Sequence, residues 1–243
     1  SRGLGDVYKR QGDSGKRAEI PQLAAAFGNT GLHFDYLLFD ACFMSSIEAL
    51  YDLRGCADRI IASPCEVMAA GFNYTDILPH LLADAGTSYD LPGVCSEYYD
   101  YYMNRATTKS GCIALTVTGE LEPLAAIVKE IETKYPGKTY DRASLQTYEG
   151  LDEHVFYDLQ GYIEAICDEK DPLLDKFRAQ MGKAFPTESR LHTPSFYSVY
   201  GLGDAPNGMH TIEDGKYSGV TTSAPCERFA PEWAQTSWYR ATH

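Results

Sequence analysis

The chain has 243 residues, 44% of them hydrophobic, and its formal net charge is −13. This hydrophobic content is sufficient for a packed globular core, arranged as one large domain or as one domain with a small appendage. The acidic balance excludes nucleic acid and anionic lipid as the main partners, because negative surfaces repel phosphate, and it favours basic substrates or partners. No run of about 18 or more apolar residues occurs, so the sequence predicts no membrane span.

Seven cysteines are distributed along the chain without a CxxC pair and without clustering near histidines. This spacing predicts neither a structural zinc site nor any other metal or cofactor site. An odd number leaves at least one free thiol, while disulfides among the others stay open. The seven are Cys42, Cys56, Cys65, Cys95, Cys112, Cys167 and Cys226.

The first eleven residues, SRGLGDVYKRQ, show no amphipathic period and resemble the adaptor-derived translation found at the broken end of a gene. We therefore exclude residues 1–11 from the fold and expect a truncated start. Residues 12–17 then form a polar loop, and residues 19–29 form a short helix that ends at Gly28 and Asn29.

A strand, a helix and a second strand follow in close succession. Residues 34–39 and 59–63 are apolar runs typical of buried strands, and residues 44–55 carry an apolar helical stripe between them. Ser45 and Glu48 have the spacing of a capping box at the start of this helix. A helix between two strands predicts a parallel pair, and hence an α/β fold with helices on the faces of a mostly parallel sheet.

The same alternation continues to the C-terminus without repeats or low-complexity tracts. Amphipathic patterns predict further helices, and apolar runs predict further strands. The aromatic end of the chain, WYRA, is expected to pack against the core. The helices are expected near 94–104, 121–135, 156–168 and 173–184, and the strands at 112–119, 196–202 and 217–225.

Cys42 differs from the other cysteines in its position, after the strand at 34–39 and directly before the helix at 44–55. Functional groups gather beyond the carboxyl ends of parallel strands. The free N–H groups of a helix N-terminus favour a thiolate, which is the nucleophilic form of cysteine, and can hold an oxyanion. An arbitrary cysteine is more often a small buried residue, but this setting makes Cys42 a candidate nucleophile.

The segments FDYLLFDACFMSSIEALYDLR and RIIASPCEVMAAGFNYTDILPHLL resemble the nucleophile region of the clostripain family of cysteine peptidases. The resemblance extends through HVFYDLQGYI and YSGVTTSAP to the terminal WYRA. It implies a caspase-like fold, with helices on both sides of a mostly parallel sheet and additional C-terminal elements. It also implies an endopeptidase that cleaves after Arg or Lys through a Cys–His dyad, with residues 12–243 forming the C-terminal portion of one such domain.

By this resemblance Cys42 matches the nucleophile, and Asp40 matches an acid placed near the pocket for the basic side chain of the substrate. From its position alone, Asp40 could equally cap the strand end or partner the N-terminus of the following helix. Many relatives carry a further Asp where this chain has Ala70. A desolvated ammonium or guanidinium group needs close pairing with a carboxylate, so this change weakens the expected selectivity for Arg and Lys.

The histidine of the dyad is the main departure from the family pattern. In the family it lies in a His-Gly motif that ends the strand before the Cys strand, and no His-Gly pair occurs in this chain. His33 is expected at the far end of the strand at 34–39 from Cys42, since each residue advances a strand by about 3.3 Å. We expect the histidine in an N-terminal part that this chain lacks, together with its neighbouring oxyanion donor, which leaves the N–H of Cys42 as the donor. The other histidines, expected to pack or to be solvated, are His80, His154, His192, His210 and His243.

Two other functions stay open. A relative that keeps the fold without catalysis would serve as a peptide-binding or structural module. LLFDAC also fits an Asp-nucleophile phosphotransferase, but such enzymes usually place a second Asp two positions after the first, where this chain has Cys42. The family resemblance further implies peptide or protein substrates with basic residues, and a location outside the cytoplasm, secreted or in the cell envelope.

Overall fold

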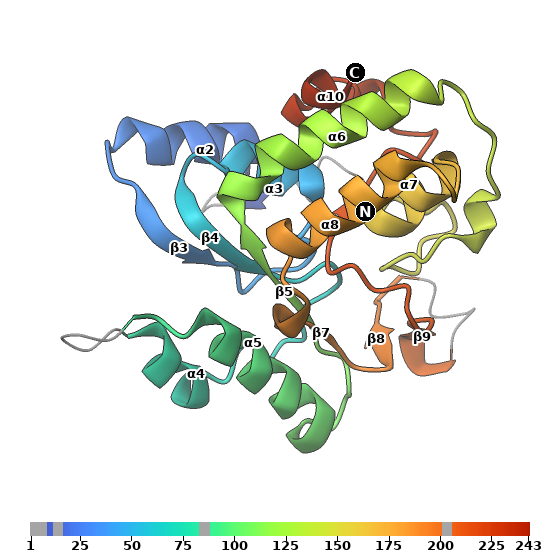
Figure 1. The fold of residues 1–243 in the computed structure, drawn as a ribbon. Coiled ribbons are helices and arrows are strands. Elements are labelled where there is room, and N and C mark those ends of the chain that lie inside the picture. Colours follow the sequence, from blue (N-terminus) through green and yellow to red (C-terminus); the bar gives the residue numbers. More distant parts are fainter. Residues whose placement is uncertain (1–8, 12–16, 83–87, 201–205) are drawn as a thin grey trace.

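A four-stranded sheet lies at the centre of the molecule (Figure 1). The structure is a computed structural model that describes residues 9–11, 17–82, 88–200 and 206–243. The strand order is β3–β4–β5–β7, with one parallel pair, β3 and β4, and two antiparallel pairs. The bounds are Phe34–Leu38 for β3, Ala57–Ala62 for β4, Cys112–Val117 for β5 and Arg190–His192 for β7.

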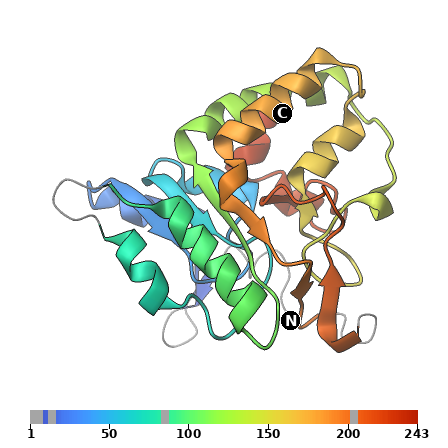
Figure 2. The same cartoon turned by 60° about the horizontal axis from the view of Figure 1, so that its bottom comes forward.

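Helices cover both faces of this sheet, as Figures 1 and 2 show. On one face the helices pack around a core that includes Leu50, Leu124 and Ile163. On the other face two helices pack around a second core that includes Val94 and Ile113. The first set is α2 (Ile20–Asn29), α3 (Ile47–Leu53), α6 (Leu121–Lys134), α7 (Leu159–Ile166) and α8 (Pro172–Ala184), and the second is α4 (Tyr74–Leu81) and α5 (Leu91–Asp100).

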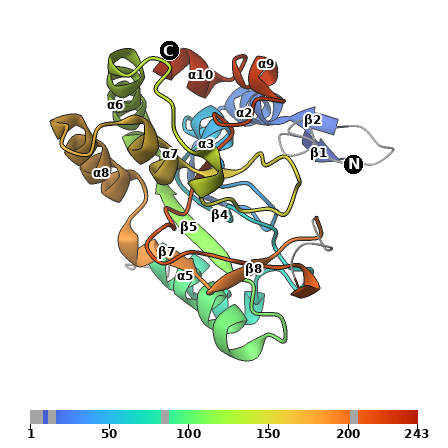
Figure 3. The same ribbon diagram turned by 90° about the vertical axis from the view of Figure 1, so that its right-hand side faces the viewer.

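Shorter elements complete the described part of the chain. α5 continues into a π-helical turn, Tyr101–Arg105. The C-terminal helices α9 (Ala230–Trp233) and α10 (Ser237–Thr242) lie beside α2 and α6 (Figure 3), and Trp238 is buried, which confirms that the aromatic end packs. The antiparallel pairs of short strands are β1 (Lys9–Gln11) with β2 (Arg17–Glu19), β6 (Tyr157–Asp158) with β10 (Thr221–Thr222), and β8 (Ser195–Tyr197) with β9 (Met209–Thr211).

The α/β class is confirmed, but the described sheet is mixed instead of mostly parallel. Each helix between two strands reverses the direction of the chain, so one helix makes the strands parallel and two make them antiparallel. One helix, α3, joins β3 to β4, whereas both α4 and α5 lie between β4 and β5. The sequence prediction contained only α5 in this connection. α4 includes Pro79, a residue that disfavours a helix interior.

β3 is less buried than its apolar sequence predicts. Four of its five residues are half-buried and Asp35 is exposed, whereas Ile60 and Ile61 of β4 are fully buried. Among the described residues β3 pairs with β4 alone, so its other edge carries no strand. The expected cover on both faces is nevertheless found, because Leu37 packs against the core on one face and Tyr36 and Leu38 pack against the core on the other.

The N-terminal end of α3 differs from the predicted capping box. Ser46 is the N-cap, and its hydroxyl accepts a hydrogen bond from the backbone N–H of Ala49 at 3.3 Å. Ser45 instead donates its hydroxyl to the carbonyl oxygen of Gly219 at 2.6 Å. Glu48 turns away from the cap into the protein, so the capping box is wrong and a single-residue cap replaces it.

Glu48 is fully buried and accepts hydrogen bonds from the C-terminal part of the chain. One carboxylate oxygen receives the Thr222 hydroxyl, the Ser223 backbone N–H and the Trp233 indole N–H, each at 2.9 Å. Burial raises the pKa of Glu48, and these donors oppose that rise. The result is a polar link between α3 and the segment 222–233.

The predicted absence of a membrane span has a structural counterpart. In the described ranges, the helices are all too short or too polar to cross a bilayer. The boundary predicted after residue 11 stays a prediction: residues 9–11 form β1, while the rest of 1–11 lies outside the described residues.

Candidate active site

The turn that follows β3 determines where the candidate residues point. Phe43 has a φ of 61°, in the left-handed region that is unfavourable for residues other than glycine. Its ring stacks on Phe156 with centroids 4.6 Å apart, and its N–H donates to the carbonyl oxygen of Cys65 at 3.1 Å. These contacts hold the strained turn in place. Cys42 directly precedes Phe43 in this turn and is exposed.

Cys42 does not sit directly at a helix N-terminus. α3 begins at Ile47 with Ser46 as its cap, four positions after Cys42, so that part of the sequence prediction is wrong. The effect of a helix terminus falls off within about its first turn. Although Cys42 is exposed, the surrounding protein partly desolvates its thiol and raises its pKa. The backbone N–H of Val67 lowers the pKa, and the carboxylate of Glu66 raises it further. The lowered pKa expected from a helix N-terminus is therefore not found in this arrangement.

The backbone of Val67 makes two hydrogen bonds with the Cys42 thiol. The N–H of Val67 donates to Sγ at 3.3 Å, and the thiol donates to the Val67 carbonyl oxygen at 3.7 Å. The N–H would stabilise a thiolate once the proton is removed. This segment, which leaves the C-terminal end of β4, was not singled out by the sequence.

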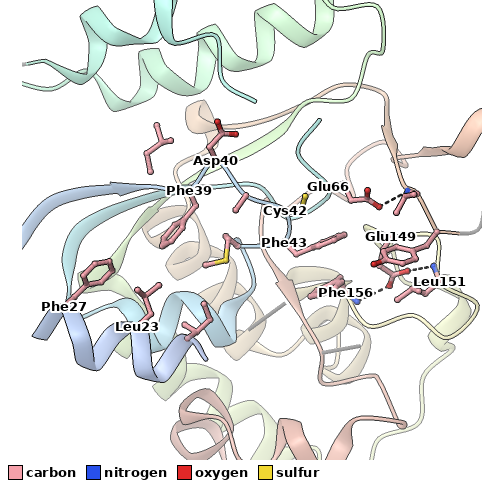
Figure 4. A pocket seen from close by; sticks show the side chains of 16 residues that line it. Leu23, Phe27, Phe39, Asp40, Cys42, Phe43, Glu66, Glu149, Leu151 and Phe156 are labelled. Atoms are coloured by element: carbon pink, nitrogen blue, oxygen red, sulfur yellow. Dashed lines mark hydrogen bonds between the residues drawn. The ribbon is translucent and has the colours of Figure 1, made fainter. Parts of the chain in front are cut away.

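Asp40 and Cys42 line one pocket of about 530 Å³ (Figure 4). The pocket brings together segments that are far apart in the sequence. One part of its wall comes from apolar side chains of α2, and another from residues that follow β4, α6 and β8. The lining residues of these walls include Leu23 and Phe27 on the first side, and Glu66, Glu149, Leu151, Phe156 and Val199 on the second.

Asp40 is exposed and faces the turn before α4. One of its carboxylate oxygens accepts the Tyr74 hydroxyl at 3.1 Å and the Phe72 backbone N–H at 3.4 Å. Gly71 in this turn has a φ of 61°, and a Cβ atom there would lie 2.5 Å from the same oxygen. The carboxylate thus packs directly over a glycine, beside the position of Ala70.

Two further carboxylates stabilise the second of these walls, which we call the far wall and which includes Glu66, Glu149, Leu151, Phe156 and Val199. Oε1 of Glu66 accepts the Ser198 hydroxyl and the Val199 N–H, both at 2.8 Å, and Ser198 in turn accepts the Gly150 N–H at 3.1 Å. Glu149 is buried and accepts backbone N–H groups of the segment that follows it. Those donors, with their distances, are Leu151 at 2.8 Å, Val155 at 2.7 Å and Phe156 at 3.2 Å.

Among the described residues that line this pocket there is no histidine. His33 lies just before β3 and pairs with Asp58 at 2.8 Å, at the opposite end of the strand from Cys42, as the strand spacing predicts. His154 pairs with Glu149 at 2.9 Å, and this contact raises the pKa of His154. The partners of the remaining histidines are Asp90 for His80, Tyr217 for His192, Phe196 for His210 and Tyr239 for His243.

Across the described ranges, acidic, histidine and cysteine side chains form no cluster of three or more that could hold a metal ion. The pocket offers an exposed thiol beside a backbone N–H donor and carboxylates. A thiol in that setting can act as a nucleophile if a base removes its proton.

Cys42 is expected to react with iodoacetamide at least about tenfold faster than any other cysteine, because alkylation requires an accessible sulfur. Cys42 is exposed, whereas the other six cysteines are buried. Brief alkylation of the folded protein, followed by peptide mass spectrometry, measures the order of labelling. Earlier labelling of Cys65 or Cys112 would contradict the assignment of Cys42 as the reactive thiol.

Models of known protein families and the sequences of curated proteins give different results for this chain. The model of the clostripain family matches residues 10–209. Comparison with curated proteins gives no match.

Solved structures of cysteine proteases share the fold. A clostripain from Bacteroides thetaiotaomicron in complex with the peptide inhibitor BTN-VLTK-AOMK is 33% identical, with a TM-score of 0.82, and the match covers 95% of this chain and 97% of that one. A secreted cysteine protease from the same species is 35% identical, with a TM-score of 0.81, over 93% of this chain and 60% of that one. An inactive zymogen protease from Parabacteroides distasonis is 30% identical, with a TM-score of 0.76, and the match covers 93% of this chain and 62% of that one. Since the family model covers most of the sequence and two of these relatives exceed 30% identity, the chain belongs to the clostripain family of cysteine peptidases.

Proposed function

We propose that this chain forms most of a cysteine endopeptidase in which Cys42 attacks the carbonyl carbon of a peptide bond. The observation that carries this proposal is the exposed thiol of Cys42 in a pocket lined also by Asp40. The attack forms an S–C bond and a tetrahedral oxyanion, which the backbone N–H of Cys42 would stabilise. The C–N bond then breaks, and the amine leaves with a proton from the general base that first took the thiol proton.

The base is proposed to come from residues outside this chain. None of the six histidines is among the described residues that line the pocket, although His154 contacts the lining carboxylate Glu149. β3, the strand that ends at the candidate site, has one edge without a strand among the described residues. A strand added in parallel to that edge would run about 4.8 Å from β3 and would end beside residues 40–42. By family resemblance, a His-Gly motif at the end of such a strand would place an imidazole near the thiol.

Asp40 is proposed to receive the basic side chain of the residue before the scissile bond. Asp40 is exposed and lines the same pocket as Cys42, and two donors fix one of its carboxylate oxygens. The net charge of −13 also attracts basic substrates. One relative binds an inhibitor whose peptide, VLTK, ends in lysine. Preference for Arg or Lys is the substrate class that these features support best.

An active-site label tests this function directly. Peptide acyloxymethyl ketones that end in lysine or in norleucine have similar size and differ in charge. We expect the lysine compound to label Cys42 at least about tenfold faster, because one charge–charge interaction is worth on the order of 1.5 kcal/mol or more once it is shielded from water. Mass spectrometry gives the labelled residue and its rate.

The outcome separates the peptidase from a non-catalytic peptide-binding module. Equal labelling by the two ketones would reject the basic specificity. Labelling of neither by a longer form that carries the proposed His-Gly strand, at a pH where iodoacetamide modifies Cys42, would reject the nucleophile and favour the binding module. Secretion or a cell-envelope location is proposed from the relatives, one of which is a secreted protease.

A further inference from the structure

The peptide group between Gly71 and Phe72 is held from both of its sides. Its carbonyl oxygen accepts the Tyr102 hydroxyl at 2.9 Å, and its N–H donates to the Asp40 carboxylate at 3.4 Å. The C=O and N–H of a trans peptide group point in opposite directions and move as one rigid unit. Fixing the carbonyl oxygen therefore fixes the direction of the N–H.

In the described part of the chain, no other hydrogen bond holds this peptide group. Gly71 has no side chain and a positive φ, so rotation of its ψ meets little steric resistance. The N–H of Gly71 does bond to the carbonyl oxygen of Met68 at 2.8 Å, which fixes the peptide group before Gly71 but not the one after it. The Tyr102 hydroxyl is thus the contact that selects the orientation facing Asp40.

Tyr102 belongs to the π-helical turn that ends α5. A π-helical turn inserts one residue into the helical repeat and redirects the side chains on it, and such turns occur frequently at functional sites. The same turn carries Arg105, which pairs with Asp76 in the first turn of α4. α4 begins with Tyr74, the second donor to Asp40. One turn therefore supports both donors that hold this carboxylate.

We propose that Tyr102 is a positioning residue for substrate specificity: its hydroxyl orients the Gly71–Phe72 peptide group, which in turn holds the Asp40 carboxylate toward a basic substrate side chain. This inference rests on the proposed role of Asp40. Tyr102 is buried. Gly111 leaves room for it, because a Cβ atom on residue 111 would lie only 2.5 Å from the Cβ atom of Tyr102. Burial raises the pKa of Tyr102 to about 12, so its hydroxyl keeps its proton and remains a donor at neutral pH.

The neighbouring Tyr98 supplies a matched control. Its ring is equally buried and lies 4.8 Å from that of Tyr102, but within the described structure its hydroxyl has no hydrogen-bond partner. Tyr102→Phe and Tyr98→Phe therefore each remove one buried oxygen and leave both rings in place. Only Tyr102→Phe removes a hydrogen bond to the turn, the one that the Tyr102 hydroxyl donates to the carbonyl oxygen of Gly71.

Two measurements test the inference. In the 243-residue chain, Tyr102→Phe should increase hydrogen exchange of the Phe72 amide about 5-fold, the loss of one ordinary hydrogen bond, whereas Tyr98→Phe should leave it unchanged. The ratio of Cys42 labelling rates for the lysine and norleucine ketones should fall about 5-fold with Tyr102→Phe. Alkylation of Cys42 by iodoacetamide should stay constant in both variants.

Failure of the inference can be told apart from failure of the proposed function. If the unmodified protein shows no lysine preference, the role of Asp40 is wrong and the positioning of a specificity group is overturned with it. If Asp40→Asn removes the preference but Tyr102→Phe and Tyr98→Phe both retain it, only the inference is overturned. Loss of amide protection throughout α5 and β5 in Tyr102→Phe would assign Tyr102 to general stability and would also overturn it.

Discussion

Residues 1–243 alone are expected to hydrolyse a fluorogenic peptide amide after Arg at least about a thousandfold more slowly than a longer form that carries a His-Gly strand. Nucleophile and base act as one unit, and loss of either commonly removes several orders of magnitude in rate. In this chain partial desolvation raises the pKa of the Cys42 thiol, which disfavours the thiolate. No histidine among the described pocket residues can return a proton to the leaving amine.

Cys42→Ala is the control for that comparison. In the longer form it should reduce turnover by several orders of magnitude, because the alanine side chain offers no nucleophile. Substantial turnover by the 243-residue chain that disappears in Cys42→Ala would contradict the proposal. It would mean that one of the six histidines of this chain reaches Cys42 in solution.

Asp40→Asn is expected to reduce kcat/KM for substrates with Arg or Lys before the scissile bond by about 30-fold or more. Removal of one member of a desolvated charge pair typically costs about 2–5 kcal/mol, whereas an exposed pair contributes under about 1 kcal/mol. For norleucine substrates the same variant should change kcat/KM by less than about fivefold, since no charge pair forms. The measurement is steady-state kinetics of the active, longer form with paired substrates.

Asp35→Asn provides a matched control for this substitution. Asp35 lies on β3, is exposed, and accepts the Tyr89 hydroxyl at 3.1 Å, the same distance as the contact between Asp40 and Tyr74. It lies on the strand itself, outside the pocket lining. Equal losses for the two variants, or equal losses for basic and neutral substrates, would assign Asp40 a structural role.

Local patterns in the sequence predicted most elements near the site. The strand at 34–39, the helix at 19–29 and the helix at 121–135 agree with β3, α2 and α6 within one or two residues. These elements depend on hydrophobic period, which short windows of sequence contain. α2 ends at Asn29, as predicted, although Gly28 lies within the helix and Gly31 is the glycine with a positive φ after it. The placement of Asp40 and Cys42 in one pocket follows from their separation by a single residue after a strand.

Contacts between distant segments could not be predicted in this way. The far wall of the pocket depends on Glu66 bonding to Ser198, 132 residues later, and no local pattern indicates such a pairing. The true role of Glu48 was missed for the same reason, because its donors lie at the other end of the chain. The antiparallel direction of β5 required knowing that α4 is a helix despite Pro79.

The burial of Glu48 has a consequence for how the protein is made. Its donors lie 174 to 185 residues further along, so α3 leaves the ribosome long before they are synthesised. A carboxylate desolvated without those donors costs several kcal/mol, so α3 cannot dock permanently until the end of translation. The turn bearing Cys42 leads into α3. Nascent chains should therefore order the turn that bears the reactive thiol only after release from the ribosome. Deletion of residues 222–233 should prevent this ordering, even though these residues lie outside the pocket lining.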